Sequence, residues 1–301
     1  MSFISFMSSV ELGFFYSLMT MGLFVSYRIL NVADLTVDGS FTLGAAVSAM
    51  LTISGHPVLA IFAAALSGAL SGMVTATLQT KLKFQPILAG ILTMTALYSI
   101  NILVMGGSPN KPLNRQITIF TMLKSAFHSS YAQAALAAII AVIAAILLIF
   151  FFKTQMGLSI RATGDNEEMV KASSINVDTT KVIGLAIANA LVATSGALIA
   201  QYQAFADIQS GLGMVVIGLA SLIIGEIIFS RKSIPLNIFA AVIGSIAYRF
   251  IIQLALEINI SFSSMKLVSA VIIIIAISFP TIRQSIIQAR KKRRSRHHVE
   301  D

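Results

Sequence analysis

Few residues in this chain could do chemistry, and they are scattered. Only 11% of the 301 residues are charged, and three charged side chains, Glu11, Glu226 and Arg249, interrupt long apolar runs. Charged groups inside a membrane are costly and mark ion pairs, snorkelling side chains or transport pathways. We interpret Glu226 as part of a structural ion pair, with Arg231 and Lys232 close by in the sequence and a transport role as the alternative. Arg249 is interpreted as a snorkelling residue.

No arrangement of residue types that is typical of catalysis accompanies these charges. The sequence has neither a G-x-x-x-x-G-K-[ST] phosphate-binding loop nor an H-E-x-x-H zinc motif. It contains no cysteine, so disulfides and thiolate metal sites are excluded. We therefore expect that the chain is not an enzyme and that it holds no metal and no cofactor.

A polar stretch, Asp34–Ser40 (DLTVDGS), precedes an apolar segment at 40–54. A helix of about 15 residues spans roughly 22 Å, less than the hydrocarbon core of about 30 Å. We therefore expect this stretch to dip into the membrane before a discontinuous helix, whose free N–H groups would suit an anionic group. Alternatively, Asp38 or Ser40 caps the helix at the cytoplasmic surface. The residues predicted to line a translocation path are Asp34, Asp38, Gly39 and Ser40.

The longest polar interval is Lys153–Lys181. Asp165 and Glu168 form a capping-box pattern, which predicts a short helix over about Asn166–Ser173. Asp178 is predicted to cap the helix that follows. A connection that folds its own helix is unusual, so we hypothesise that this helix docks onto another protein. The alternative is an interfacial helix that lies on the lipid.

The elements that must position these groups are membrane-spanning helices. The chain is 56% hydrophobic with a mean hydropathy of +0.87, whereas soluble domains carry about 25% charged residues. Continuous apolar runs such as VIIIIAIS (271–278) differ from the alternating pattern of a transmembrane barrel. We predict an all-α, polytopic membrane helix bundle of about 8–10 spans, one of them discontinuous. Nine apolar segments are counted, at 12–27, 40–54, 57–79, 86–106, 131–152, 182–204, 212–229, 235–255 and 265–282.

The distribution of basic residues orients the predicted bundle. If 153–181 is cytoplasmic, alternation of the spans places 16 of the 21 lysine and arginine residues on the same side, as the positive-inside rule requires. The N-terminus is then outside and the C-terminus is cytoplasmic. Residues 1–285 form the transmembrane domain, with 153–181 as its cytoplasmic loop. Residues 286–301 form a basic tail, which is expected to contact anionic lipid and not nucleic acid.

Three stretches resemble one family of membrane proteins. The interval GLSIRATGDNEEMVKASSINVDTTKVIGLAIANALVATSGALIAQY is similar to the signature region of ABC importer permeases of the branched-chain amino acid and ribose type. That region reads G-x-x-x-R-A-x-G/A, then several acidic residues, G/S-I-N-V and an Ala/Gly-rich span. NVADLTVDGSFTLGAAV resembles the G-I-D-L-S-V-G-S stretch of sugar permeases, from which it departs by the additional Asp38. GLASLIIGEIIF (218–229) looks closest to a subgroup paired with tryptophan/tyrosine-type binding proteins. The resemblance covers roughly residues 10–282.

The resemblance implies a role for each part. The loop helix at 165–174 would be a coupling helix seated in a groove of an ABC ATPase subunit. The family works as a permease dimer, here expected to be a homodimer, with two ATPase subunits and an extracytoplasmic solute-binding protein. ATP would be used by the partner subunit, and the chain would import a small solute, an amino acid or similar, across the bacterial plasma (inner) membrane. The residues implied in coupling are Gly157, Arg161, Gly164, Asp165, Glu167, Glu168, Met169, Ala172 and Asn176.

Two other classes of function remain as alternatives. An ion-coupled secondary transporter would transport without an ATPase and is expected to carry a buried ionisable pair, which the sequence does not reveal. A membrane-embedded enzyme or scaffold is expected to cluster His, Asp or Ser near one face, and no such cluster is evident.

Overall fold

The computed structural model describes residues 3–114, 116–127, 132–229, 233–257 and 267–271, together with residues 274 and 278. Its regular structure is almost entirely helical, as predicted. The helices are α1 Phe3–Leu23, the π-helical turn η1 Phe24–Ile29, α2 Thr36–Ile53, α3 Pro57–Thr80, α4 Pro86–Val104, α5 Ile119–Phe127, α6 Ala132–Phe151, α7 Gln155–Asp165, α8 Glu167–Ala172, α9 Val177–Gln203, α10 Met214–Ile228 and α11 Ile234–Glu257. Two short strands, β1 Asn110–Pro112 and β2 Phe205–Asp207, pair antiparallel.

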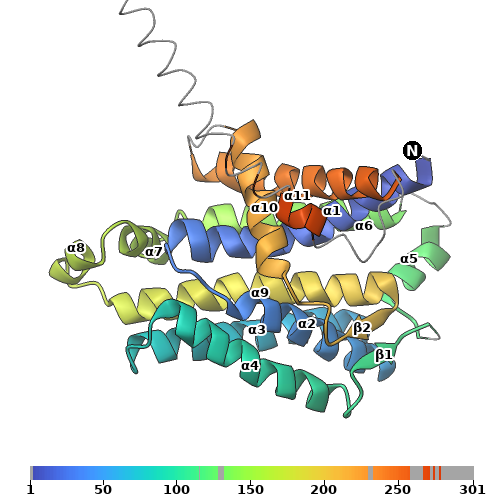
Figure 1. Ribbon diagram of the computed structural model, residues 1–301, viewed down its shortest axis with the longest axis horizontal. Helices are drawn as coiled ribbons and strands as arrows, with labels where there is room; N and C mark the ends of the chain where they lie inside the picture. The colour runs from blue at the N-terminus through green and yellow to red at the C-terminus, as the bar shows by residue number, and fades with distance from the viewer. Residues whose placement is uncertain are drawn as a thin grey trace, which may run out of the picture.

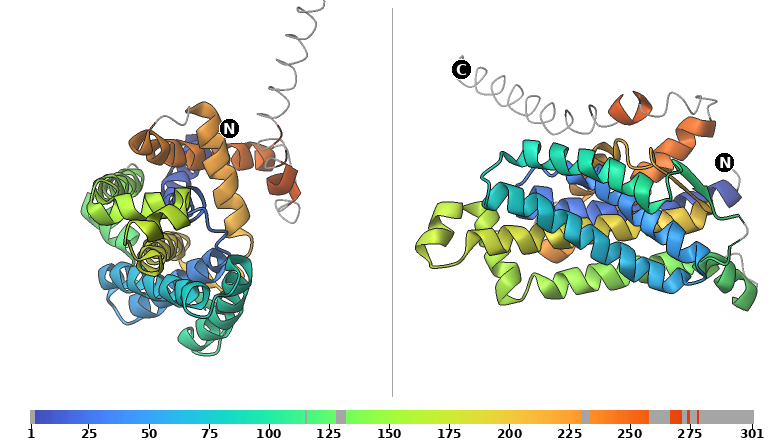
Figure 2. Two further views of the ribbon diagram at one scale, coloured as in Figure 1. Left: turned by 90° about the vertical axis from the view of Figure 1, so that its left-hand side faces the viewer. Right: turned by 90° about the horizontal axis from the view of Figure 1, so that it is seen from below.

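The long helices lie side by side along one axis (Figure 1). At one end of the bundle α7 and α8 project beyond the other helices, and at the opposite end lie β1, β2, α5 and the start of α1 (Figures 1 and 2). Below, these are called the α7–α8 end and the β1–β2 end. Seven helices among the described residues are long and apolar enough to cross a membrane, which makes the chain a multi-pass membrane protein.

Burial differs strongly between the helices because the centre of the bundle is built from small and polar residues. In the most apolar window of α2 and of α9, 72% and 67% of the residues are buried, compared with 17% in α6. The exposed faces of α3, α4 and α6 carry large apolar side chains, for example Phe62, Leu103 and Leu147. Apolar side chains that face outward can stay in contact with lipid, because lipid tails are also apolar and the hydrophobic effect does not drive helices together there.

Glycines allow α3 to pack directly on α9. A Cβ atom at Gly68 would collide with the backbone of Asn189, and one at Gly72 would collide with the backbone of Leu185. The sequence pattern of small residues four apart predicts such close approach between helices in lipid. These contacts fix the position of α9, whose Asn189 bonds to Asp34.

The second predicted segment is longer than expected. Helix α2 begins at Thr36 and has 18 residues, which corresponds to about 27 Å. It is continuous once it has begun, and the dip of the preceding polar stretch into the membrane stays a prediction. The irregular backbone precedes it, at residues 30–35. The ninth predicted segment and the tail, including Arg290–Arg296, lie mostly outside the described residues.

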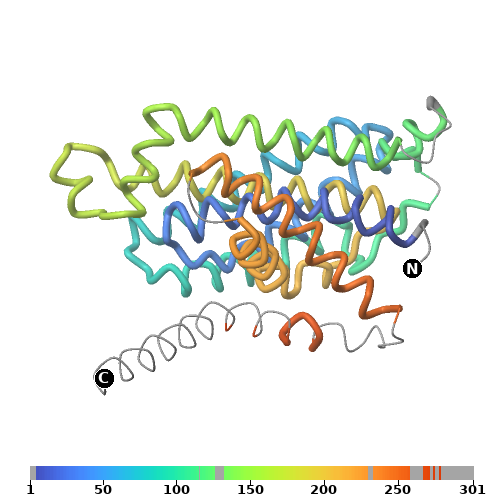
Figure 3. Tube along the Cα trace, turned by 90° about the horizontal axis from the view of Figure 1, so that it is seen from above, coloured from blue at the N-terminus to red at the C-terminus, as the bar shows by residue number. Residues whose placement is uncertain are grey.

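The seventh predicted segment contains a short helix that is steeply inclined to the others. Helix α10 has only 15 residues and crosses the long axis of the bundle at a steep angle in Figure 1, so that it is seen nearly end-on in Figure 3. Residues 208–213, which connect β2 to α10, are not helical. The turn into α10 is made at Gly213, whose φ of +86° is accessible to glycine at little cost.

Candidate functional site

The first polar residue of the 34–40 stretch, Asp34, is buried within the bundle. Its carboxylate accepts hydrogen bonds from the backbone N–H of Thr36 at 2.9 Å and from the side-chain amide of Asn189 at 2.7 Å. Asn189 lies near the middle of α9, so Asp34 is far from either end of that helix. The sequence predicted that free N–H groups at the start of α2 would bind an anionic group. Asp34 is that group, because it accepts a hydrogen bond from an N–H in the first turn of α2.

Two hydroxyl pairs attach the start of α2 to α3. Thr36 bonds to Thr75 and Ser40 bonds to Ser71, each with an oxygen–oxygen distance of 2.7 Å. Ser40 has no exposed surface. Its position therefore indicates a role in helix packing.

Gly39 brings the backbone of α2 close to α4. A Cβ atom at this position would lie 2.9 Å from Leu97 Cδ1 and 3.2 Å from Met94 Cα. The side-chain amide of Asn101 donates a hydrogen bond of 3.2 Å to the carbonyl oxygen of Gly39. The close approach expected at this glycine is thus present, and a larger residue would separate the two helices.

Asp38 connects α2 to the N-terminus of α10. Its carboxylate accepts hydrogen bonds of 2.9 Å from the backbone N–H groups of Gly213 and Val215, at the N-terminus of α10. A negative charge at this end of a helix is favourable by about 0.3–1 kcal/mol at exposed positions and by up to about 2 kcal/mol when partly buried. Asp38 therefore occupies the N-terminus of α10, as Asp34 occupies that of α2.

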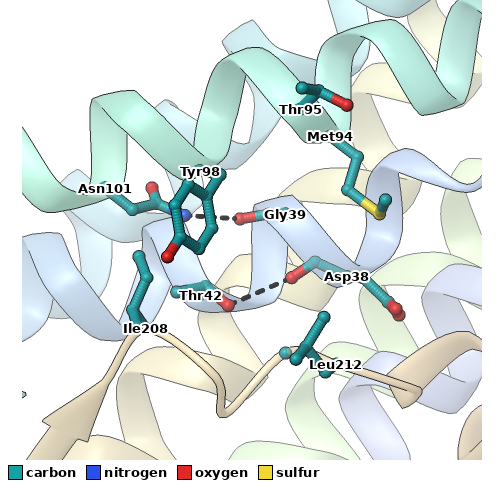
Figure 4. Close-up of a pocket in the computed structure, with 10 residues that line it drawn as sticks. Asp38, Gly39, Thr42, Met94, Thr95, Tyr98, Asn101, Ile208 and Leu212 are labelled. Atoms are coloured by element: carbon teal, nitrogen blue, oxygen red, sulfur yellow. Dashed lines mark hydrogen bonds between the residues drawn. The ribbon is translucent and has the colours of Figure 1, made fainter. Parts of the chain in front are cut away.

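Asp38 and Gly39 border a cavity of about 310 Å³ between α2, α4 and the 208–212 connection (Figure 4). This volume is at the lower end of the range of small-molecule sites, roughly 300–1,000 Å³. The sequence pointed to Asp38 and Gly39 but not to the α4 side chains or the 208–212 connection. The residues that line the cavity are Asp38, Gly39, Thr42, Met94, Thr95, Tyr98, Asn101, Ile208, Gly211 and Leu212.

The polar interval 153–181 folds into two helices where one was predicted. Helix α7 begins after Thr154, whose hydroxyl accepts a hydrogen bond from the N–H of Gly157, and it ends at Asp165. Helix α8 is capped by Asn166, whose side-chain oxygen accepts from the N–H groups of Glu168 at 3.0 Å and Met169 at 3.1 Å. The predicted cap at Asp165 is wrong by one residue. Asparagine and aspartate cap helices about equally well, so the residue types do not tell which of the two neighbours is the cap.

The cap of the next helix also differs from the prediction. Asn176 accepts a hydrogen bond of 3.2 Å from the N–H of Thr179 and caps α9. Asp178, which was predicted to be the cap, lies inside the first turn and faces Lys81 at 3.8 Å. Both side chains of that pair are largely exposed, so this contact contributes little to stability.

The residues implied in coupling fall into two groups, and the first packs within the chain. A Cβ atom at Gly157 would collide with the backbone of Phe151, and one at Gly164 with the carbonyl oxygen of Ile29. The Glu167 carboxylate forms an ion pair with Lys181. Together with Asn176, these residues hold α7 and α8 against the bundle.

The second group is exposed. Met169 is 59% exposed, and Ala172 is also exposed, whereas Val170 between them is buried. Arg161, Asp165 and Glu168 are exposed as well. The projection therefore offers a surface with a small apolar patch and charged neighbours.

The three charges that interrupt apolar runs all have partners in the bundle. Arg28 donates two hydrogen bonds of 2.6 Å to Glu226, so the predicted structural ion pair exists, although with a partner from η1. Arg231 and Lys232 lie outside the described residues. Tyr202 donates a hydrogen bond of 2.6 Å to Glu11.

The third charge, Arg249, stacks on an aromatic ring. Its guanidinium lies 3.7 Å from the ring centroid of Tyr16, a favourable cation–π geometry. The predicted snorkelling is therefore replaced by a contact within the bundle. Within the described ranges, no group of three or more His, Asp or Glu side chains is placed to hold a metal ion.

The sequence matches a known family over nearly its whole length. Residues 6–278 match the model of the branched-chain amino acid transport system permease component. The chain belongs to this permease family. The permease is 37% identical over 259 residues to a tyrosine transport system permease protein of Clostridioides difficile, covering 86% of this chain and 85% of that protein. It is also 24% identical over 247 residues to the ribose import permease protein RbsC of Escherichia coli, covering 81% and 75% of the two chains.

The fold of the permease is shared with a solved structure. A chain of PsaBC from Streptococcus pneumoniae, determined in complex with Fab, aligns with a TM-score of 0.53 over 90% of this chain and 89% of that one, at 14% identity. Relatives in this family are transport subunits and not enzymes, in agreement with the absence of catalytic motifs from the sequence.

Proposed function

We propose that this permease is the membrane-spanning subunit of an ATP-driven importer that takes up an amino acid. The tyrosine transport relative supports the amino acid, because the two chains align over most of both lengths. The ribose permease aligns at lower identity, so a sugar is the less favoured substrate. ATP is hydrolysed by a separate ATPase subunit, and an extracytoplasmic solute-binding protein delivers the solute to a homodimer of the permease.

The α7–α8 projection is the observation that carries this proposal. It extends beyond the membrane-spanning helices, it is capped at Thr154, Asn166 and Asn176, and it exposes Met169 and Ala172. A rigid, exposed and partly apolar helix end is suited to seat in a groove of another protein, since little conformational entropy is lost on docking.

The proposed orientation follows from this assignment. The α7–α8 end faces the cytoplasm and the ATPase, and the β1–β2 end faces the solute-binding protein. The C-terminus is then cytoplasmic, in the plasma (inner) membrane of a bacterium, and the basic tail contacts anionic lipid.

The test is to reconstitute the permease with its ATPase and binding protein and to measure ATP-driven uptake in Ala172→Arg. The substitution adds bulk and charge to the exposed surface of α8 and leaves the spans untouched. We expect transport to fall at least tenfold, with the ATPase either lost from the complex or no longer stimulated by the loaded binding protein. Ala172→Ser is the matched control and keeps wild-type uptake.

Two outcomes would contradict the proposal. Full ATP-driven uptake by Ala172→Arg would remove the docking role from α8. Uptake by the wild-type permease that needs an ion gradient but no ATPase would favour an ion-coupled secondary transporter.

A further inference from the structure

The cavity between α2, α4 and the 208–212 connection has the chemistry of a binding site. Its lining includes four large side chains that are wholly or mostly apolar, Met94, Tyr98, Ile208 and Leu212. Among the described residues that line the cavity, Asp38 is the one charged side chain. A cavity that combines apolar walls with a single carboxylate favours a solute that has an apolar part and one cationic group.

The carboxylate of Asp38 is held in place before any ligand arrives. Gly213 and Val215 donate their backbone N–H groups to its two oxygens, and the N-terminus of α10 stabilises the negative charge. Gly211 fixes the connection against α2, because a Cβ atom there would collide with the carbonyl oxygen of Asp38. A cationic group that enters the cavity therefore meets a preorganised acceptor, which lowers the entropic cost of binding.

Asn101 gives a second, independent indication. This residue is 1% exposed, and its side-chain N–H donates to Gly39. Its amide oxygen accepts no hydrogen bond from any residue that the structure describes. A buried acceptor without a donor costs about 1–3 kcal/mol, and Asn101 borders the same cavity as Asp38 (Figure 4). A donor group on the part of a ligand that lies at this side of the cavity, away from Asp38 (Figure 4), would satisfy it.

We propose that this cavity is a substrate-binding site within the permease itself, which takes a neutral amino acid with an apolar or aromatic side chain. The α-ammonium group pairs with Asp38, and the side chain lies against Met94, Tyr98 and Leu212. A sugar, which has no cationic group and needs many hydrogen bonds, fits this lining less well. The assignment rests on amino acid import as the proposed function and adds recognition by the permease to it.

Because Asp38 also holds the start of α10, binding and helix position are linked. A ligand that bonds to the Asp38 carboxylate changes the electrostatic environment of the Gly213 and Val215 N–H groups. If the ligand binds more tightly when α10 is in one position than in another, the equilibrium between the two positions shifts by that difference in binding free energy. The cavity thus lies where a bound solute would affect the position of α10.

The test measures binding to the permease–ATPase complex in lipid nanodiscs without the solute-binding protein. The probe is radiolabelled L-tyrosine, and the competitors are its des-amino analogue 3-(4-hydroxyphenyl)propionate and D-ribose. We expect saturable binding, with the des-amino analogue competing at least tenfold more weakly than unlabelled tyrosine and with no competition by ribose. Asp38→Asn should weaken tyrosine binding at least tenfold and reduce the difference between tyrosine and the analogue. A purely structural role for Asp38 would leave that difference unchanged.

Two further variants keep the test decisive. Leu212→Trp fills the cavity without touching the Asp38 hydrogen bonds and should also weaken binding at least tenfold. Asp178→Asn makes the same change of side chain at the α7–α8 end and should bind tyrosine as the wild type does. Wild-type affinity in both Asp38→Asn and Leu212→Trp would overturn the site.

The two proposals fail in different ways. If the complete transporter imports tyrosine with ATP but the permease–ATPase complex does not bind it, the cavity is not a substrate site and the proposed function stands. If the complex binds tyrosine in the cavity but the complete transporter drives no amino acid uptake, the proposed function fails and the binding site stands.

Discussion

The α7–α8 projection and the start of α2 are both built from short polar stretches, but they are held in place at different ranges. The caps of the projection come from neighbours in the sequence: Asn166 and Asn176 each bond to N–H groups two or three residues away. At the start of α2, Asp34 and Asp38 bond to groups 155 and 175 residues away, in α9 and at α10.

This difference has consequences for function. A surface supported by local caps can change its exposed side chains without disturbing the bundle, which suits docking to a separate protein. The start of α2 is hydrogen-bonded to α3, α4, α9 and α10, so it cannot change without moving these helices. The start of α2 is therefore suited to transmit a change at the cavity to α4 and α10, since coupling needs contiguous packed contacts.

Gly39→Leu, at the start of α2, is expected to have the largest effect on uptake. The new side chain must occupy the space of Leu97 and Met94, which lie 2.9–3.2 Å from a Cβ atom at this position. Overpacking of this kind typically costs about 1–3 kcal/mol, and it would also fill the cavity. We expect uptake to be abolished at equal expression, with a lower unfolding temperature in detergent. Gly39→Ala serves as the graded control and should retain part of the uptake. Normal transport by the leucine variant would show that this stretch is a passive cap.

How much of this the sequence could predict depends on the range of the contacts. The lengths of the apolar runs predicted most of the spans, because a run long enough to cross a membrane is visible in any window. The packing glycines Gly68 and Gly72 were also visible, as was the polar stretch around Asp38. Helix α7 was missed because 155–165 has no strong apolar periodicity, and the cap at Asn166 was misplaced because Asp165 is an equally good capping type.

Long-range partners could not be predicted. Nothing near Glu226 indicates that its partner is Arg28, 198 residues away. Tyr98 and Asn101 lie within an apolar run, where the sequence does not tell which face meets α2. The segment 212–229 has the composition of an ordinary span, and only the fold reveals that its helix is short and that its N-terminus contacts Asp38.

A second prediction concerns the ion pair between η1 and α10. Arg28 lies in the last turn of η1, before the 30–35 stretch, and Glu226 lies on α10. Removing one partner of a buried pair costs about 3–5 kcal/mol, and because Arg28 is partly exposed we expect Glu226→Gln to lie near 3 kcal/mol. Thermal unfolding of the purified permease measures the effect. The double variant Arg28→Gln/Glu226→Gln should recover part of the loss, since no charge is then left unpaired. Equal losses in the single and double variants would argue against coupling between the two side chains.

The smallest expected effect is also the one that best separates local from long-range support. Asn166→Ala removes the side chain that accepts the N–H groups of Glu168 and Met169, which costs about 0.5–2 kcal/mol. Because these hydrogen bonds are local, we expect α8 to fray while the unfolding temperature of the bundle stays within about one degree of the wild type. ATP-driven uptake should fall several-fold, since a frayed helix must be ordered again when it docks. Asp165→Ala is the matched control: Asp165 is exposed and ends α7, so its loss should change uptake less than the loss of Asn166. Hydrogen exchange of the Glu168 and Met169 amides reports the fraying directly. If Asp165→Ala exposes these amides and Asn166→Ala does not, then the cap is the residue that the capping-box pattern predicted and the assignment to Asn166 is wrong.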